Sequence, residues 1–186
     1  MGIGEVTKAV FLDRDGVLNL AMVRDGRPYP PSGLDQLQLY PDAADALASL
    51  KQAGYLLIVV TNQPDVARGT QTREAVDAMN AAIGKVLPVD EFLVCWHDDS
   101  EGCDCRKPKP GLVLAAAATY QIDLSRSFLI GDRWRDIDCG AAAGVRTVLI
   151  DRQYRERSPA SPPDHVADSL ASAAAWILKV SKITPG

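Results

Sequence analysis

The stretch CWHDDSEGCDCRKPKPG, at residues 95–111, brings together side chains that bind soft metal ions. Three of the four cysteines in the chain and one of its two histidines lie within it. The spacing is Cys-x-His, five intervening residues and Cys-x-Cys, which offers three thiolates and one imidazole to a tetrahedral zinc ion. Because four protein ligands leave no position for water, we predict a structural Zn²⁺ site with the ligands Cys95, His97, Cys103 and Cys105.

The residues that follow this predicted zinc site suggest its role. Arg106 and Lys107 come directly after Cys105, so a bound metal ion would hold this basic pair in a fixed position. Two alternatives remain open, namely surface thiols and a disulfide. A thioredoxin-like redox site is disfavoured, because Cys103-x-Cys105 lacks the Cys-x-x-Cys spacing of such sites.

Polar clusters follow three of the predicted buried strands, and two of these clusters carry aspartates. They are Asp13-Arg14-Asp15-Gly16, Thr61-Asn62-Gln63 and Gly131-Asp132-Arg133. Because ligand sites of parallel sheets lie beyond the carboxyl ends of the strands, we expect the three clusters to meet at one edge of the sheet. Carboxylates packed together repel each other unless a cation is present, and hard oxygen ligands with little histidine favour Mg²⁺.

The first cluster has the residue types that phosphoryl transfer requires. Asp13 can attack phosphorus, and Asp15, two residues on, can act as general acid at the leaving oxygen. Gly16 allows the chain to turn sharply after them. Thr61 and Lys107 can hold the phosphoryl oxygens, because an anionic nucleophile that approaches an anionic phosphate needs cationic cover. The alternative interpretation is a solvated aspartate-rich turn.

The segments that must position these residues alternate between short apolar and amphipathic stretches. Short strands that are apolar on both faces suit a parallel sheet covered by helices on both sides. We therefore predict an α/β fold, a Rossmann-like parallel sheet sandwiched by helices, as a single domain over residues 1–186 with 151–165 as an extended loop. The predicted strands are 8–13, 55–62, 91–96, 127–132 and 146–151, and the predicted helices are 41–54, 72–87, 109–121, 133–144 and 169–179.

The composition excludes several classes of protein. A net charge of −4 argues against a nucleic-acid-binding face, which needs clustered lysine and arginine. No apolar run approaches the length of a membrane span, and the start MGIGEVTKAVFLD lacks the apolar centre of a secretion signal. We expect a cytoplasmic protein, where thiols stay reduced and clustered cysteines indicate metal binding or catalysis.

Four segments, in their order along the chain, resemble the motifs of the haloacid-dehalogenase-like (HAD) phosphatases. They are VFLDRDGVLN, VVTNQPDVARG, CRKPKPG and FLIGDRWRDIDCGAAAG. The pairing of TNQ…ARG with a Cys/His loop before RKP narrows the likeness to a zinc-containing subgroup of heptose-bisphosphate and histidinol-phosphate phosphatases. The chain departs from this subgroup at Pro64-Asp65, where Ser-Gly is frequent, and at Arg133, where lysine is common.

The resemblance implies a role for each matching residue. Asp13 becomes an aspartyl-phosphate, and Asp15 serves first as the acid and later as the base for the hydrolytic water. Mg²⁺ is held by Asp13, the backbone carbonyl of Asp15, and Asp132. Asp136 orients Lys107 or a metal-bound water. The implied substrate-binding residues are Thr61, Asn62, Gln63, Arg106, Lys107 and Arg133.

The segments that follow Asp15 and Thr61 are too short for a cap domain, so we expect an open site and a monomer that acts on a small phosphorylated metabolite. The resemblance implies removal of the 7-phosphate of a heptose 1,7-bisphosphate in lipopolysaccharide synthesis. Three alternatives stay open: a histidinol-phosphate phosphatase, a polynucleotide 3′-phosphatase, which the negative net charge disfavours, and a non-catalytic zinc-stabilised binding module. Arg24 and Arg27 follow the catalytic turn and are either solvated or in contact with a distal substrate group.

Overall fold

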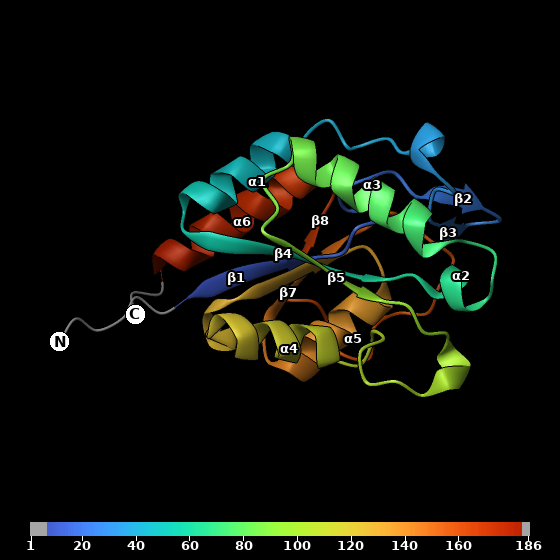
Figure 1. The fold of residues 1–186 in the computed structure, drawn as a ribbon. Coiled ribbons are helices and arrows are strands. Elements are labelled where there is room, and N and C mark those ends of the chain that lie inside the picture. The colour runs from blue at the N-terminus through green and yellow to red at the C-terminus, as the bar shows by residue number, and fades with distance from the viewer. Residues whose placement is uncertain (1–6, 184–186) are drawn as a thin grey trace.

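The centre of the protein is a six-stranded parallel sheet (Figure 1), seen in a computed structural model that describes residues 7–183. Its strands are β1 (Lys8–Leu12), β4 (Tyr55–Asn62), β5 (Glu91–Cys95), β6 (Phe128–Gly131), β7 (Arg146–Ile150) and β8 (His165–Ala167). The order across the sheet is β5-β4-β1-β6-β7-β8. The five predicted strands are confirmed. The sixth, β8, was not predicted, since it has three residues and follows a proline-rich loop.

Helices cover both faces of this sheet, so the predicted α/β sandwich is confirmed (Figure 1). Along β1 the side chains alternate, with Val10 and Leu12 in one core and Ala9 and Phe11 in the other. The first core is closed by α1 (Ala43–Gln52), α3 (Arg73–Val86) and α6 (Leu170–Ile183), and the second by α4 (Gly111–Tyr120) and α5 (Trp134–Ala143). The alternation explains why each strand reads as continuously apolar.

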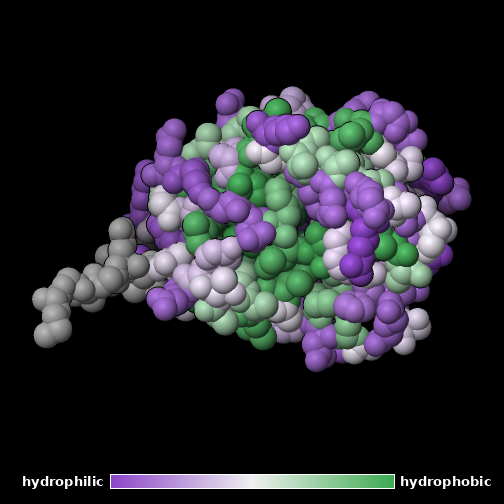
Figure 2. Space-filling model, in the orientation of Figure 1, coloured by the Kyte–Doolittle hydropathy of each residue, from purple (hydrophilic) through white to green (hydrophobic). Residues whose placement is uncertain are grey.

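The surface reflects this layered arrangement. Figure 2 shows hydrophobic residues across the middle of the face that carries α3, β5 and α4 in Figure 1, with hydrophilic residues around them. The edge strand β5 is half-buried there, because Phe92 packs on one core and Leu93 on the other. Within residues 7–183, no helix combines the length and the hydropathy that crossing a bilayer requires.

A two-stranded hairpin between β1 and α1 was not predicted. Its strands are β2 (Met22–Arg24) and β3 (Arg27–Tyr29), and they pair antiparallel. The loop residues Asp25 and Gly26 have φ of 53° and 76°, and a type I′ turn requires positive φ at both positions. Asp-Gly between short strand-forming segments is a known hairpin signal, so the sequence did contain the information. Apart from this hairpin, the connection contains one 3-10 turn, η1 (Leu34–Gln36), which agrees with the predicted absence of a cap domain.

The topology fixes where a ligand can bind. β1 is central, with β4 on one side and β6 on the other, and the chain returns to the two sides through separate crossovers. Such a switch point creates a crevice beyond the carboxyl ends of the strands. The polar clusters that follow β1, β4 and β6 therefore converge at this edge.

Candidate functional site: an aspartate–lysine pocket beside a cysteine–histidine loop

The turn after β1 brings its aspartates against the end of β6. The backbone N–H of Asp13 donates to the carbonyl of Ile130 at 2.9 Å, which continues the strand pairing by one residue. Gly16 then reverses the chain with φ of +90°, a conformation that side chains rarely adopt. A Cβ at this position would lie 1.7 Å from Oδ2 of Asp132. The glycine therefore permits both the turn and the close approach of Asp132.

Asp15 is held by side chains from its own turn after β1 and from the residue that follows β4. Its carboxylate accepts hydrogen bonds from Arg14 (Nη2–Oδ2 3.0 Å), Asn19 (Nδ2–Oδ1 3.0 Å) and Gln63 (Nε2–Oδ2 2.8 Å). Arg14 is fully buried and also donates to Oδ1 of Asn80 on α3, at 3.0 Å. The carboxylate thus has a fixed orientation, while the side chain stays 15% exposed to the pocket.

The structure gives Gln63 and Arg14 roles that the sequence analysis had not stated. Gln63 was predicted to bind substrate, but it is buried and donates to Asp15 and to Oγ1 of Thr61, the latter at 3.0 Å. Arg14 was missed because a DxDG motif leaves its second position undefined. Its partner Asn80 lies 66 residues away, so no local pattern could have linked them.

Lys107 connects the cysteine–histidine loop, residues 95–105, to the aspartates. Its Nζ, almost completely buried, contacts Oδ1 of Asp13 at 2.8 Å, Oδ1 of Asp136 at 2.6 Å and the carbonyl of Val60 at 2.7 Å. The side-chain amide of Asn62 exchanges two hydrogen bonds with the Lys107 backbone, at 3.0 and 3.1 Å. The ammonium group is therefore fixed at the end of β4, with its charge directed at Asp13.

The aspartates form a buried cluster with more negative charge than its one lysine balances. Carboxylate oxygens of Asp13, Asp132 and Asp136 lie within 4.8 Å of one another. Burial raises the pKa of Asp13 to about 6, although Lys107 acts in the opposite direction. Burial, together with Asp13 and Asp136, raises the pKa of Asp132 well above its usual value. For Lys107, burial disfavours the charge, but Asp13 and Asp136 outweigh it and raise the pKa.

The donor set of this cluster fits a hard divalent cation. Both carboxylate oxygens of Asp132 are buried, and neither accepts a well-formed hydrogen bond from residues 7–183, although the Tyr154 hydroxyl interacts with this carboxylate. Buried carboxylate oxygens without donors are costly unless a cation or water satisfies them. Oxygen-only ligands suit Mg²⁺, as the sequence predicted.

A pocket of about 250 Å³ opens above the cluster and contains most of the predicted substrate-binding residues. Arg106 and Arg133 lie on its wall, and both are paired: Arg106 Nε donates to Oδ1 of Asp99 at 2.8 Å, and Arg133 forms a bidentate pair with Glu156. Gln63 and Asp132 lie outside the lining. The candidate site residues named in the sequence analysis that do line it are Asp13, Asp15, Arg27, Thr61, Asn62, Arg106, Lys107, Arg133 and Asp136.

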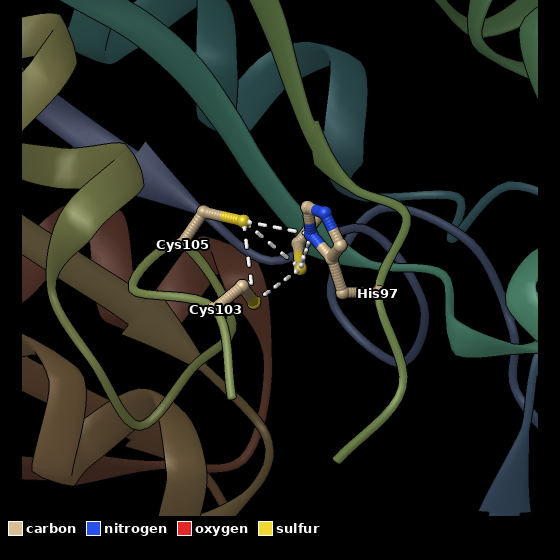
Figure 3. A group of neighbouring side chains, drawn as sticks. His97, Cys103 and Cys105 are labelled. Atoms are coloured by element: carbon tan, nitrogen blue, oxygen red, sulfur yellow. Dashed lines mark hydrogen bonds between the residues drawn. The ribbon is translucent and has the colours of Figure 1, made fainter. Parts of the chain in front are cut away.

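Three of the predicted zinc ligands, His97, Cys103 and Cys105, converge in the loop after β5 (Figure 3), and the fourth, Cys95, ends that strand beside them. Cys105 Sγ lies 3.2 Å from Cys95 Sγ, 3.5 Å from Cys103 Sγ and 3.3 Å from His97 Nδ1. The edges of a tetrahedron with Zn–S bonds of about 2.3 Å are about 3.8 Å, close to the 3.8 Å between Cys95 and Cys103. Cys95, Cys103 and Cys105 are free cysteines, which speaks against the disulfide alternative. Burial raises the pKa of Cys95 to about 12, so a cation is needed to hold its thiolate.

This loop is tied to α5 and to the start of α4. Asp99, in the short helical turn of the loop, accepts hydrogen bonds from Arg106 and from Arg135 of α5. At its other end, the N–H of Gly111 donates to the carbonyl of Asp104 at 3.1 Å, where a Cβ would lie 2.3 Å from that oxygen. The loop thus delivers Lys107 to the aspartates while it packs on the start of α4.

The comparison with protein families agrees with this geometry. Residues 104–173 match the family described as HAD-hydrolase-like. This range includes Lys107, Asp132 and Asp136, which the structure brings together.

Individual relatives cover far more of the chain. The chain is 36% identical to the D-glycero-beta-D-manno-heptose-1,7-bisphosphate 7-phosphatase of Pseudomonas putida, over 81% of this chain and 86% of that protein. It is 34% identical to the phosphatase of the same name from Pseudomonas aeruginosa, over 91% of this chain and 97% of that protein. The crystal structure of D,D-heptose 1,7-bisphosphate phosphatase from B. bronchiseptica, complexed with magnesium and phosphate, superposes with a TM-score of 0.78. The superposition covers 94% of this chain and 99% of that chain, at 30% sequence identity. The chain therefore belongs to the HAD-like hydrolases, in the family of the D-glycero-D-manno-heptose-1,7-bisphosphate 7-phosphatases.

Proposed function

We propose that this protein is a Mg²⁺-dependent phosphatase that removes the 7-phosphate of D-glycero-D-manno-heptose 1,7-bisphosphate. The contact of Lys107 with Asp13, beside the fixed carboxylate of Asp15, carries this proposal. This arrangement supports a nucleophile, a counter-charge and an acid around one pocket. The relatives named for this reaction support the choice of substrate. As the sequence analysis predicted, the reaction would serve lipopolysaccharide synthesis in the cytoplasm.

In the first step, Asp13 attacks the phosphorus atom, and the bond from phosphorus to the sugar oxygen breaks. Asp15 donates its proton to that leaving oxygen, and its three hydrogen-bond donors keep the carboxyl group directed at it. Lys107 offsets the repulsion between the anionic nucleophile and the anionic phosphate. Thr61 and Asn62 line the same pocket and would contact the phosphoryl oxygens.

In the second step, water attacks the aspartyl-phosphate, Asp15 accepts a proton from it, and the bond between Asp13 and phosphorus breaks to release inorganic phosphate. Asp13, Asp132 and the backbone carbonyl of Asp15 would hold Mg²⁺, which supplies a Lewis acid that neutralises charge on the phosphoryl group. Asp136 keeps Lys107 in place at 2.6 Å through both steps.

The cysteine–histidine loop would contribute structure rather than chemistry. Cys95, His97, Cys103 and Cys105 would bind Zn²⁺ in a closed tetrahedral shell with no position for substrate. Cys105 is two residues from Lys107, so the metal would restrict the backbone that presents the ammonium group.

A direct comparison of substrates tests the proposal. We expect kcat/KM for heptose 1,7-bisphosphate to exceed that for histidinol phosphate and for p-nitrophenyl phosphate, with Mg²⁺ required and turnover lost in EDTA. A higher kcat/KM on histidinol phosphate would assign the other predicted substrate. No turnover of any phosphate ester would favour the non-catalytic binding module.

A further inference from the structure

The segment after β7, residues 151–157, is more than a connection, because its inward side chains contact the candidate site. Exposed and half-buried residues alternate along it, and the half-buried ones are Arg152, Tyr154 and Glu156. An extended backbone turns every second side chain to the same side, so these three face the body of the protein together. We call residues 152–156 the strap.

The two outer side chains of the strap fix its position. Arg152 Nε donates to the carbonyl of Gly16 at 3.0 Å, in the turn after β1, and its guanidinium lies 4.1 Å from the ring centroid of Tyr40. Glu156 accepts a hydrogen bond from Arg133 Nε at 3.0 Å, in the turn after β6. The strap is therefore anchored on the two turns that carry the aspartates.

Tyr154 lies between these two anchors and reaches Asp132. A Cβ at Gly16 would lie 3.0 Å from the Tyr154 hydroxyl oxygen and 1.7 Å from Oδ2 of Asp132, so both groups approach the same glycine. The hydroxyl interacts with the Asp132 carboxylate, although without the geometry of a well-formed hydrogen bond. Burial and the nearby charge of Asp132 raise the pKa of Tyr154, so its hydroxyl keeps the proton that it can donate.

The three clustered carboxylates differ in what orients them. Asp13 and Asp136 both contact the Lys107 ammonium group, at 2.8 and 2.6 Å. Both oxygens of Asp132 are buried, and within residues 7–183 neither accepts a well-formed hydrogen bond. The Tyr154 hydroxyl is thus placed to orient the one carboxylate of the cluster that the lysine does not pair with.

We propose that Tyr154 is a positioning residue whose hydroxyl orients the Asp132 carboxylate for Mg²⁺. An ionised carboxylate has about four lone-pair sites, so donation from the tyrosine leaves room for the ion. The inference rests on the Mg²⁺ site of the proposed function, but not on the identity of the substrate. Because the hydroxyl acts on a metal ligand, it is expected to change the affinity for Mg²⁺ rather than the chemical step.

The test removes only the hydroxyl, in Tyr154→Phe. We expect the Kd for Mg²⁺ to rise about 10-fold or more, as is typical when the partner of a metal ligand is lost. Thermal unfolding of the substrate-free protein over a series of Mg²⁺ concentrations measures this Kd without any turnover. In the enzyme assay, the Mg²⁺ concentration for half-maximal activity should rise by a similar factor, while kcat at saturating Mg²⁺ stays near its wild-type value.

Tyr55 provides a matched control at the other end of the sheet. It is a buried tyrosine whose hydroxyl lies 2.5 Å from Oγ of Ser181. It begins β4, whereas the end of that strand, Asn62, lines the catalytic pocket. Tyr55→Phe removes a hydroxyl contact of the same kind, so it should lower Tm and leave the Kd for Mg²⁺ at its wild-type value.

Each outcome decides the inference. It is overturned if Tyr154→Phe binds Mg²⁺ like the wild type, if Tyr55→Phe weakens Mg²⁺ binding as much, or if Tyr154→Phe lowers kcat by one factor at every Mg²⁺ concentration. Weaker Mg²⁺ binding in Tyr154→Phe, in a protein that hydrolyses no phosphate ester, would support the positioning role and refute the proposed phosphatase. A wild type whose Tm does not respond to Mg²⁺ would overturn both the inference and the proposed Mg²⁺ dependence.

Discussion

The aspartate cluster and the cysteine–histidine cluster both fit metal ions, but the fold assembles them differently. Asp13 follows β1, Asp132 follows β6 and Asp136 lies in the first turn of α5, so Asp13 meets the other two only because β1 pairs with β6. The four soft ligands come from one loop of eleven residues, 95–105, and only Cys95 belongs to the sheet. The first cluster depends on tertiary structure, while the second is encoded almost entirely in local sequence.

The clusters also differ in whether their own residues supply all the partners that their polar atoms need. The aspartates leave both oxygens of Asp132 without well-formed hydrogen bonds, which suits an exchangeable cation and a reacting phosphate. The cysteine–histidine set offers four protein ligands, as many as a tetrahedral Zn²⁺ ion requires. In the proposed mechanism, reactivity belongs to the aspartate cluster and rigidity to the cysteine–histidine cluster, with Lys107 as the link between them.

The largest expected effect comes from Asp13→Asn. This change removes the proposed nucleophile but keeps the side-chain volume, so we expect kcat to fall by about 10³-fold or more. Zinc content and secondary structure should match the wild type, because the other cluster is untouched. Steady-state kinetics with elemental analysis measures both. Near-wild-type kcat in this variant would remove Asp13 from the nucleophile role.

Next in size is the loss of one zinc ligand in Cys105→Ser. Without the metal the loop that presents Lys107 loosens, and misplacing a catalytic group by about 1 Å costs about 100-fold in rate. We expect the variant to lose zinc, to unfold at a lower Tm and to lose about this much kcat/KM. The fourth cysteine gives the control: Cys139→Ala, on the buried face of α5, should keep its zinc. A zinc-free Cys105→Ser enzyme with full activity would contradict the link through Lys107.

A smaller, graded effect is expected from pH on the aspartate cluster. The folded-state pKa of Asp13, about 6, lies above the usual value of about 3.9, so its protonation stabilises the metal-free fold, and this contribution is lost as pH rises through about 6. Mg²⁺ needs the ionised form. Its apparent affinity should weaken below about pH 6, by about tenfold per pH unit for each proton displaced. Thermal unfolding with and without Mg²⁺ measures this, and equal Mg²⁺-induced Tm shifts at about pH 5 and about pH 7.5 would argue against it.

The smallest effect is expected far from both clusters, at the start of α3. Thr72 accepts a hydrogen bond from the N–H of Ala75 at 3.1 Å and caps the helix, as predicted. Thr72→Ala should lower the free energy of unfolding by about 1 kcal/mol and leave kcat unchanged. Denaturant unfolding measures the first and kinetics the second. A large loss of activity here would mean that α3 controls the site more strongly than its contact through Asn80 indicates.

The sequence predicted the parts of the molecule in which one local signal determines the result. Buried parallel strands such as β4 are continuously apolar, and their ends could be read from the polar residues that follow. The cysteine–histidine loop was predicted because its four possible ligands are close in the chain, and because thiolates with an imidazole are typical ligands of zinc. Asp13 and Asp15 were recognisable from two carboxylates around one residue before a glycine.

The contacts that the sequence did not reveal join distant residues or lie in short elements. The bidentate pair of Arg133 with Glu156 joins α5 to a long loop and has no pattern in the chain. The buried link from Asp15 through Arg14 to Asn80 depends on how α3 packs. The hairpin was different, because Asp25-Gly26 is a sufficient local signal that the analysis did not use.

The separation of the three carboxylates along the chain has a consequence for biosynthesis. A nascent polypeptide that ends before Phe128 lacks β6, Asp132 and Asp136. It therefore contains Asp13 without the two carboxylates that form the cluster with it. The cysteine–histidine loop is complete as soon as Cys105 has left the ribosome. Metal binding by the thiols can therefore precede the synthesis of Asp132 and Asp136. The aspartate cluster would then form late, beside a loop whose conformation the metal ion already holds.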